Sequence, residues 1–290
     1  MPSYKTHSIH GGIIIPDIEK HVDIDKNDMK TFCVGPDALM VSDNKIFEYQ
    51  HANKVREYFI KMIRYIKRNK LLDNEQVMAF LYGQIDHLVL DSVMHPFIYY
   101  MTEGIKSDTV FQTHGLVEMW IDDYVEGRYE TEPITYHQIT DRNLLRLIDK
   151  LYSEIFKTKN ESIKYNIGYF LIYLFDVLGR HNMLGIIEPI TKIGKIGDII
   201  YRRDIKRALP FLNTGREIWT NPETDESYCM SFDDLWRKSI EVSLETINDV
   251  NNYLYSGKTL NNQIIMSDTS YNTGLSCSKG QILKHIKRWQ

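Results

Sequence analysis

The sequence predicts an all-α fold, built as a single compact domain of many helices. Apolar residues recur at helical spacing in several long segments, whereas alternating strand patterns are scarce. The chain has 290 residues and no internal repeat or low-complexity segment, and a chain of this length can bury a large core. We therefore expect one helical domain over residues 1–257, with residues 258–290 as a C-terminal extension that packs on it.

Individual segments support this fold class. In residues 53–69 the apolar side chains form one stripe of an amphipathic helix. Residues 74–95 are apolar nearly all round, which predicts a helix at the centre of the domain. The amphipathic stripe consists of Val55, Tyr58, Phe59, Met62, Ile63 and Ile66. Further helical patterns occupy residues 114–129, 143–158 and 231–256. The last of these opens with Ser231 and Asp234, which resemble a capping box.

Three segments are less regular. Residues 11–17 (GGIIIPD) are the best candidate for a strand, and a loop is an equal alternative. Residues 256–280 are polar and predict a loop that wraps back onto the helical body. Residues 214–222 (TGREIWTNP) predict a turn that packs on the core, with a lid over a substrate as the alternative.

Composition excludes several classes of protein. The formal net charge of −4 argues against a general nucleic-acid binder. Cys33, Cys229 and Cys277 are far apart and form no CxxC pair, which suits a reducing compartment better than a disulfide framework. The first residues lack the basic and apolar regions of a secretory signal, and the most apolar run is broken by Asp176. We therefore expect a soluble, cytoplasmic protein.

The segment YGQIDHLVLDSVMHPF, residues 82–97, places His87, Asp91 and His95 at intervals of four. Residues four apart on a helix lie on one face, with Cβ atoms about 5–6 Å apart, so His87 and Asp91 can grip one ion. His87 and His95 are separated by roughly 12 Å of helical rise, too far to share an ion easily. The spacing favours two neighbouring ions with Asp91 between them. Pro96 predicts that the helix ends or kinks at His95.

A second pair at the same spacing is His114 with Glu118. A single HxxxD or HxxxE pair is more often a surface pair or a buried histidine with an ordinary partner. Two pairs in strongly apolar surroundings are harder to explain in that way, because buried histidines and carboxylates are costly unless paired or bound to metal. The residues alone leave a metal site and ordinary pairing as alternatives.

Several motifs together resemble the zinc-dependent phospholipase C family in order and spacing. They are VGPDALM at 34–40, then His51, HLVLDSVMHPF at 87–97 and HGLVE at 114–118. Secreted members of that family include the bacterial phosphatidylcholine-hydrolysing phospholipase C and the clostridial α-toxin. The likeness extends to residues 1–11, 211–236 and 267–275, which look like a smaller, unsecreted branch. It therefore covers most of the chain.

The resemblance implies two to three Zn²⁺ ions with a definite set of ligands. The first zinc would be held by Asp37, His51, His87 and Asp91, and the second by His95, His114 and Glu118. Asp91 would also bridge to a third zinc, with His7 as the preferred histidine there and His10 as the second choice. Asp37 would be both a ligand and the candidate catalytic proton acceptor.

The sequence departs from the secreted enzymes in three places. No tryptophan stands at the start of the chain, and the step from Asp91 to His95 is four residues instead of six. Ala38 replaces an aromatic residue associated with choline, so choline specificity is not expected. Asp86 and Glu48, next to ligands in sequence, are interpreted as solvated surface carboxylates. His137, His181 and His285 have no partner at ligand spacing and are interpreted as structural or exposed.

The function implied is a zinc-dependent phosphodiester hydrolase that cleaves a phospholipid in the manner of a phospholipase C. One alternative is a tri-zinc phosphoesterase or nuclease that acts on a soluble substrate, and another is a metal-stabilised binding protein without activity. A phospholipid is the expected partner, and nucleic acid is not expected. Residues 278–290 carry a basic, amphipathic pattern compatible with peripheral membrane contact, although docking on the body is the preferred interpretation.

Overall fold

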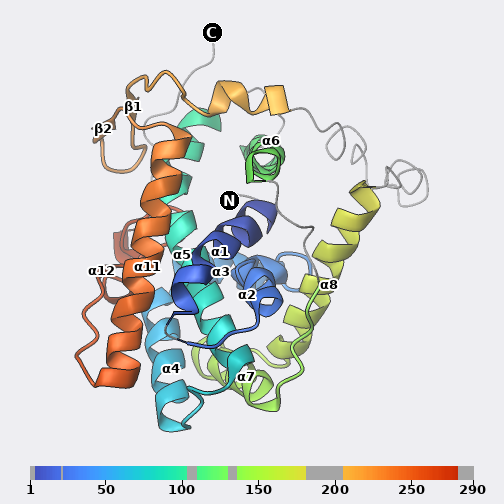
Figure 1. Cartoon of the computed structure of the whole chain (residues 1–290). Helices are drawn as coiled ribbons and strands as arrows, with labels where there is room; N and C mark the ends of the chain where they lie inside the picture. The colour runs from blue at the N-terminus through green and yellow to red at the C-terminus, as the bar shows by residue number, and fades with distance from the viewer. Residues whose placement is uncertain (1–3, 21, 103–109, 130–135, 181–204, 280–290) are drawn as a thin grey trace.

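The computed structural model describes residues 4–20, 22–102, 110–129, 136–180 and 205–279. Over these residues the fold is all-α, as the sequence predicts, with one two-stranded antiparallel hairpin (Figure 1). The helices are α1 (Tyr4–Ile18), α2 (Lys26–Phe32), α3 (Asn44–Ala52), α4 (Val55–Arg68), α5 (Glu75–Thr102), α6 (Val110–Tyr129), α7 (Arg142–Ile155), α8 (Glu161–Arg180), α11 (Phe232–Ser256) and α12 (Gln263–Met266). The 3₁₀ segments are η1 (Gly35–Leu39), η2 (Ile205–Arg207), η3 (Leu209–Phe211) and η4 (Cys277–Lys279), and the strands are β1 (Trp219–Thr220) and β2 (Ser227–Tyr228).

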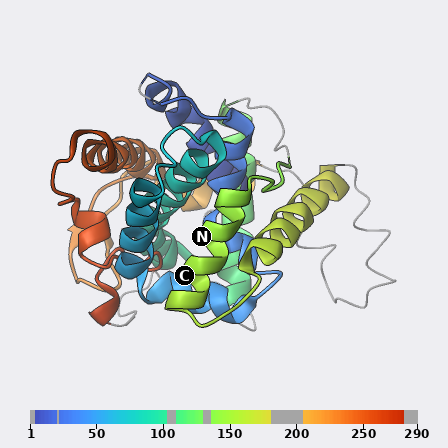
Figure 2. The ribbon, with the colours of Figure 1, turned by 90° about the horizontal axis from the view of Figure 1, so that it is seen from below.

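Helix α5 lies at the centre, as predicted for residues 74–95. It packs most extensively against α11 and α2, and it also contacts α1, α4, α6 and α7. Seen from below, α11 and α8 lie towards opposite edges of the molecule, with α5 between them (Figure 2). Almost every side chain of α5 from Val77 to Phe97 is buried, including the ionisable ones. The helix can therefore present functional groups on several faces within the core.

Pro96 does not end α5, which continues to Thr102, so of the two predicted outcomes, an end or a kink at His95, the end is wrong. A proline in a helix cannot donate a hydrogen bond to the carbonyl one turn earlier, here that of Ser92. Gly274 from the C-terminal loop packs against this carbonyl so closely that a Cβ on Gly274 would lie 2.5 Å from the Ser92 oxygen. Burial of the apolar residues that follow, Phe97 and Ile98, favours continuing the helix.

Residues 11–17 belong to α1, so neither a strand nor a loop forms there. Helix α1 is buried on most sides because α2, α5, α6 and α11 all contact it. Its first turn is held by acidic groups: Asp122 Oδ1 accepts hydrogen bonds from the Thr6 amide at 2.9 Å and its hydroxyl at 2.6 Å. The Lys5 ammonium lies 3.1 Å from Glu126 and 3.3 Å from Asp176. These long-range contacts outweigh the weak helical preference of the Gly-Gly pair.

The other predicted helices are present in the structure, whereas the polar segment predicted as a loop contains α12 and η4. The six apolar residues of the α4 stripe are its buried residues. Helix α11 begins with a capping box, in which the side chains of Ser231 and Asp234 each bond the other residue's backbone amide. Residues 258–279 wrap back onto the helices, and the Tyr271 amide donates a hydrogen bond of 3.1 Å to the His51 carbonyl. No helix within the described ranges combines the length and the apolar character required to span a bilayer.

Helix α8 supports η1 through a backbone-to-backbone contact at Gly168. A Cβ on Gly168 would lie 1.8 Å from the Ala38 carbonyl oxygen, which no side chain can tolerate. η1 carries Asp37, so this contact determines how far from α8 that residue lies.

We expect Gly168→Ala to destabilise the fold by about 1–3 kcal/mol, because the added methyl group must push η1 away from α8. In an unhindered helix the same change would be stabilising by roughly 0.5–1 kcal/mol. A loss of stability would therefore indicate the close contact between Gly168 and Ala38. Gly215→Ala, in a turn, is the control for a methyl group added where there is space, since a Cβ there meets nothing within 4 Å. Urea unfolding of both variants is the measurement, and a Gly168→Ala protein as stable as the wild type would contradict the packing.

Candidate metal centre

Three groups of potential metal ligands lie together in the interior. They are His7 with His87 and Asp91, Asp37 with His51 and His87, and His95 with His114 and Glu118. Within each group the ligand atoms lie within 4.8 Å of one another, and all these residues are buried. They come from α1, η1, α3, α5 and α6, so the site forms only when these elements pack around α5.

Asp91 faces two of the groups at once. Its Oδ1 lies 3.2 Å from Nε2 of His7, and its Oδ2 lies 3.1 Å from Nε2 of His87 and 3.9 Å from Nε2 of His51. The His7 and His87 rings are stacked, with their centroids 4.0 Å apart. This is the arrangement expected of a carboxylate that bridges two ions.

Asp37 and His51 complete the group on one side of Asp91. Asp37 Oδ1 lies 3.1 Å from Nε2 of His51 and 3.6 Å from Nε2 of His87. Gly35 lies two residues before Asp37. Its φ of +59° is unfavourable for any residue with a side chain. A Cβ on Gly35 would also lie 2.4 Å from Cγ of His87. Glycine at this position therefore lets η1 approach the histidine closely.

The third group lies further along α5. His114 and Glu118 stand one turn apart on α6, with Nε2 and Oε1 2.7 Å apart. His95 Nε2 lies 3.9 Å from the same Glu118 oxygen, and the His95 and His114 rings have centroids 5.5 Å apart. The two pairs predicted from the sequence thus reach different groups, His87–Asp91 on one side and His114–Glu118 on the other.

Backbone carbonyls orient three of the histidines. Nδ1 of His51 lies 2.7 Å from the Phe47 carbonyl, Nδ1 of His87 lies 3.0 Å from that of Cys33, and Nδ1 of His95 lies 2.5 Å from that of Tyr271. A carbonyl can only accept, so each Nδ1 carries a proton, and in the neutral ring the Nε2 lone pair is directed into the cluster. Holding the other ring nitrogen in this way is typical of metal-ligating histidines.

Several atoms of the cluster have no hydrogen-bond partner among the described residues, although they are fully buried. They are both ring nitrogens of His7, Nε2 of His87, Nε2 of His95 and both carboxylate oxygens of Asp91. A buried polar group without a partner costs about 1–3 kcal/mol, and a charged one costs more. Nitrogen and carboxylate oxygen are ligands that zinc accepts. The residues present therefore fit zinc, whose binding would satisfy these atoms.

Electrostatics in the cluster favour metal binding. Burial lowers the pKa of His7 and His114 and lowers that of His95 to about 3, so these rings are neutral at pH 7, as a ligand must be. Burial also acts to lower the pKa of His87, but Asp91 and Asp37 outweigh it and raise the value to about 8, so this ring must release a proton at pH 7 when it binds an ion. Burial opposes ionisation of Asp91, yet the surrounding histidines hold its pKa well below the usual range. Asp91 is therefore an anion at neutral pH.

His7 and His10, the two candidates for the third site, have different environments. His7 faces Asp91, whereas His10 has ordinary partners on both ring nitrogens: Nδ1 lies 2.8 Å from Asp86 Oδ1, and Nε2 lies 2.8 Å from the Ser239 hydroxyl. The geometry therefore favours His7.

The interpretation of Asp86 as a solvated surface carboxylate is wrong, because its side chain is fully buried. Its Oδ1 accepts a hydrogen bond of 2.8 Å from Ser243 in addition to the contact with His10. Burial opposes its ionisation, but His10 and Ser243 outweigh this effect and lower the pKa of Asp86. Asp86 therefore ties α5 to α1 and α11, and it lies one residue before His87. Its burial was not visible in the sequence, because α5 is apolar nearly all round and has no polar face.

The remaining candidates lie apart from the cluster. Glu48 is exposed, as predicted. His137 has partners, with Nδ1 3.2 Å from Asp28 and 3.7 Å from Asp25, which sequence spacing did not reveal. His181, His285 and the basic segment 280–290 fall outside the described residues. Residues 214–222 run into the hairpin, and Trp219 is buried against Phe97 with ring centroids 5.3 Å apart, so this tryptophan packs on the core.

Together these features define a class of site, a buried centre of histidines and carboxylates suited to more than one metal ion. Comparison with protein families identifies the class of protein. The family model for zinc dependent phospholipase C matches residues 6–162, which is more than half of the chain and includes every predicted ligand from His7 to Glu118. The protein therefore belongs to the family of zinc-dependent phospholipases C. A search of curated proteins and a search of solved structures each found no match.

We expect Asp91→Asn to lose at least one zinc equivalent and nearly all hydrolytic activity, on the order of 10³-fold or more. An amide is a poor zinc ligand, and the ions that the carboxylate separates would then repel each other. Asp73→Asn is the control, because it is the same chemical change at an exposed residue just before α5. Elemental analysis and an activity assay test both variants, and a full zinc complement in Asp91→Asn would exclude bridging.

Asp86→Ala should lower the free energy of unfolding by roughly 2–4 kcal/mol, because it leaves the buried His10 and Ser243 groups without their shared acceptor. Glu48→Ala should change it by less than about 0.5 kcal/mol. Chemical denaturation of the two variants measures the difference. Equal stability of the two would mean that the buried network contributes nothing.

Proposed function

We propose that this protein is a zinc-dependent phosphodiester hydrolase that cleaves a phospholipid on the glycerol side of phosphorus, as a phospholipase C does. The observation that carries the proposal is the bridging position of Asp91 between two ligand groups, in a chain that belongs to the zinc-dependent phospholipase C family. We further propose two to three zinc ions per chain, with His7, Asp37, His51, His87, Asp91, His95, His114 and Glu118 as their ligands. One domain formed by residues 1–257, with the residues after it packed on its surface, would carry the activity.

The chain's own residues supply the charge balance that this chemistry needs. Bound zinc would lower the pKa of a water to roughly 7 and offset charge on the phosphoryl oxygens. Asp37, Asp91 and Glu118 partly neutralise the ions while leaving the site positive, which favours a phosphate diester over a neutral ester. The imidazoles are held by backbone carbonyls, so the ligand positions are fixed before the substrate binds.

The burial pattern indicates which ligands a substrate can reach. His7, His87, Asp91 and His95 are wholly inaccessible, whereas Asp37, His114 and Glu118 retain 4–8% of their exposure. A phosphate would therefore meet the cluster at these three residues. Asp37 combines contact with two histidines and residual exposure, so it is the residue best suited to accept a proton from the attacking water.

Zinc content and zinc-dependent turnover of different substrates separate this function from the alternatives. We expect two to three zinc equivalents per chain in protein purified without chelator, measured by elemental analysis. Removing zinc should abolish hydrolysis of phospholipid vesicles and also lower the melting temperature, because a ligand that binds the native state stabilises it.

The same preparation should be assayed on bis-p-nitrophenyl phosphate and on single-stranded DNA. Hydrolysis of the soluble substrates without hydrolysis of phospholipids would identify a soluble-substrate phosphoesterase. Fully zinc-loaded protein without activity on any of the three would identify a metal-stabilised binding protein. Zinc content near zero after incubation with zinc would overturn the metal centre itself.

A further inference from the structure

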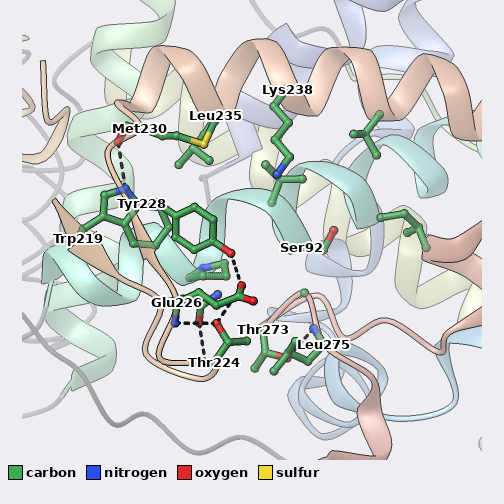
Figure 3. A pocket seen from close by; sticks show the side chains of 16 residues that line it. Ser92, Trp219, Thr224, Glu226, Tyr228, Met230, Leu235, Lys238, Thr273 and Leu275 are labelled. Carbon is green, nitrogen blue, oxygen red and sulfur yellow. Dashed lines mark hydrogen bonds between the residues drawn. The ribbon is translucent and has the colours of Figure 1, made fainter. Parts of the chain in front are cut away.

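A cavity lies against a face of α5 that carries none of the proposed zinc ligands. Its volume is about 270 Å³, and none of the proposed zinc ligands lines it. Its walls come from five elements: α5 with Ser92, Val93 and Pro96, the β1–β2 hairpin, the first half of α11, α12 with Ile264, and the loop around Gly274. Figure 3 shows these side chains converging on one space. Small-molecule sites typically measure about 300–1,000 Å³, so the cavity suits a compact ligand better than an acyl chain.

The cavity is lined by one positive and one negative side chain, both exposed and neither with an ion-pair partner among the described residues. Lys238 descends from α11 towards the cavity, and Glu226 rises from the hairpin on the opposite side (Figure 3). No salt bridge joins them, so their charged atoms lie more than 4.0 Å apart with space between. The two charges are thus positioned to bind opposite ends of one ligand.

The side chains around Glu226 are suited to binding a cation. The Tyr228 hydroxyl donates a hydrogen bond of 2.5 Å to Glu226 Oε2, which fixes the carboxylate next to the tyrosine ring. Tyr228 is itself held in place by Trp219, because the two rings pack with centroids 4.9 Å apart. The Trp219 indole N–H in turn donates a hydrogen bond to the Met230 carbonyl. An ammonium group near a carboxylate and an aromatic ring gains both ion pairing and cation–π attraction.

From these observations we propose that the cavity is a binding site for a small zwitterion. Its anionic group, a carboxylate or a phosphate monoester, pairs with Lys238, and its ammonium group lies beside the Glu226 carboxylate and against the Tyr228 ring. The apolar part of the ligand contacts Leu235, Val242 and Leu275. This proposal does not depend on the hydrolase activity, because the cavity and the metal centre share no side chain.

The site has a structural connection to the metal centre. Ser92 and Pro96 directly follow Asp91 and His95, and the loop of Gly274 also carries Tyr271, whose carbonyl holds His95. A ligand that fixes α5 against this loop would therefore also fix the orientation of a zinc ligand.

Titration calorimetry on the zinc-loaded protein tests the proposal with two zwitterions, phosphoethanolamine and leucine, which distinguish a phosphate from a carboxylate. Ethanolamine carries only the positive charge and serves as the single-charge control. At least one zwitterion should bind with 1:1 stoichiometry, and ethanolamine should not. Lys238→Ala and Glu226→Gln should each weaken that binding by about tenfold or more, since each removes a charged contact.

Matched controls separate this site from phosphate binding at the zinc ions. Lys258→Ala and Glu245→Gln make the same changes at exposed residues outside the cavity and should bind like the wild type. All four variants should hydrolyse bis-p-nitrophenyl phosphate like the wild type, so a failure of the proposed hydrolase function would be seen separately. The proposal is overturned if neither zwitterion binds, or if Lys238→Ala and Glu226→Gln bind both as tightly as the wild type.

Discussion

The structure depends on the burial of one carboxylate, that of Asp91, in the middle of the central helix. An ionised carboxylate without compensation is too costly to bury in a protein core. Here each oxygen faces a histidine from a different direction, Oδ1 towards His7 on α1 and Oδ2 towards His87 on its own helix. Asp91 gains these partners only if α1, which carries His7, and α3, which carries His51, both pack around α5. Folding of the helices and assembly of the metal centre are therefore one process.

The surroundings of α5 reflect the same requirement. Asp122, Glu126 and Asp176 hold the first turn of α1, where His7 lies, through Thr6 and Lys5. Asp86 and His10 tie the next turn of α1 to α5 and α11. Backbone carbonyls also orient the histidines: that of Phe47 belongs to the helix of His51, that of Cys33 follows α2, and that of Tyr271 lies in the C-terminal loop. Membership of the zinc-dependent phospholipase C family agrees with a core organised around metal ligands, rather than around apolar contacts alone.

The central helix serves two sites on different faces. One face carries His87, Asp91 and His95 towards the proposed zinc ions, and another carries Ser92, Val93 and Pro96 towards the zwitterion cavity. A helix buried on all sides can do this because successive residues point in directions about 100° apart. The C-terminal loop contacts both faces, through the Tyr271 carbonyl at His95 and through Gly274 at Ser92. This loop therefore belongs to the functional part of the molecule, although its sequence alone indicates only a polar extension.

The sequence by itself determined what depends on residues close together along the chain. The all-α class, the buried stripe of α4, the capping box of α11 and the two pairs at helical spacing, His87–Asp91 and His114–Glu118, follow from local periodicity and are present in the structure. The tertiary structure alone decided the features that depend on distant partners. Residues 11–17 are helical because four helices surround them, and Asp86 is buried because His10 and Ser243 bind it. Helix α5 passes Pro96 within a packed environment, and a carbonyl far along the chain orients His95. Contacts across such separations leave no periodic pattern, so only the folded arrangement could reveal them.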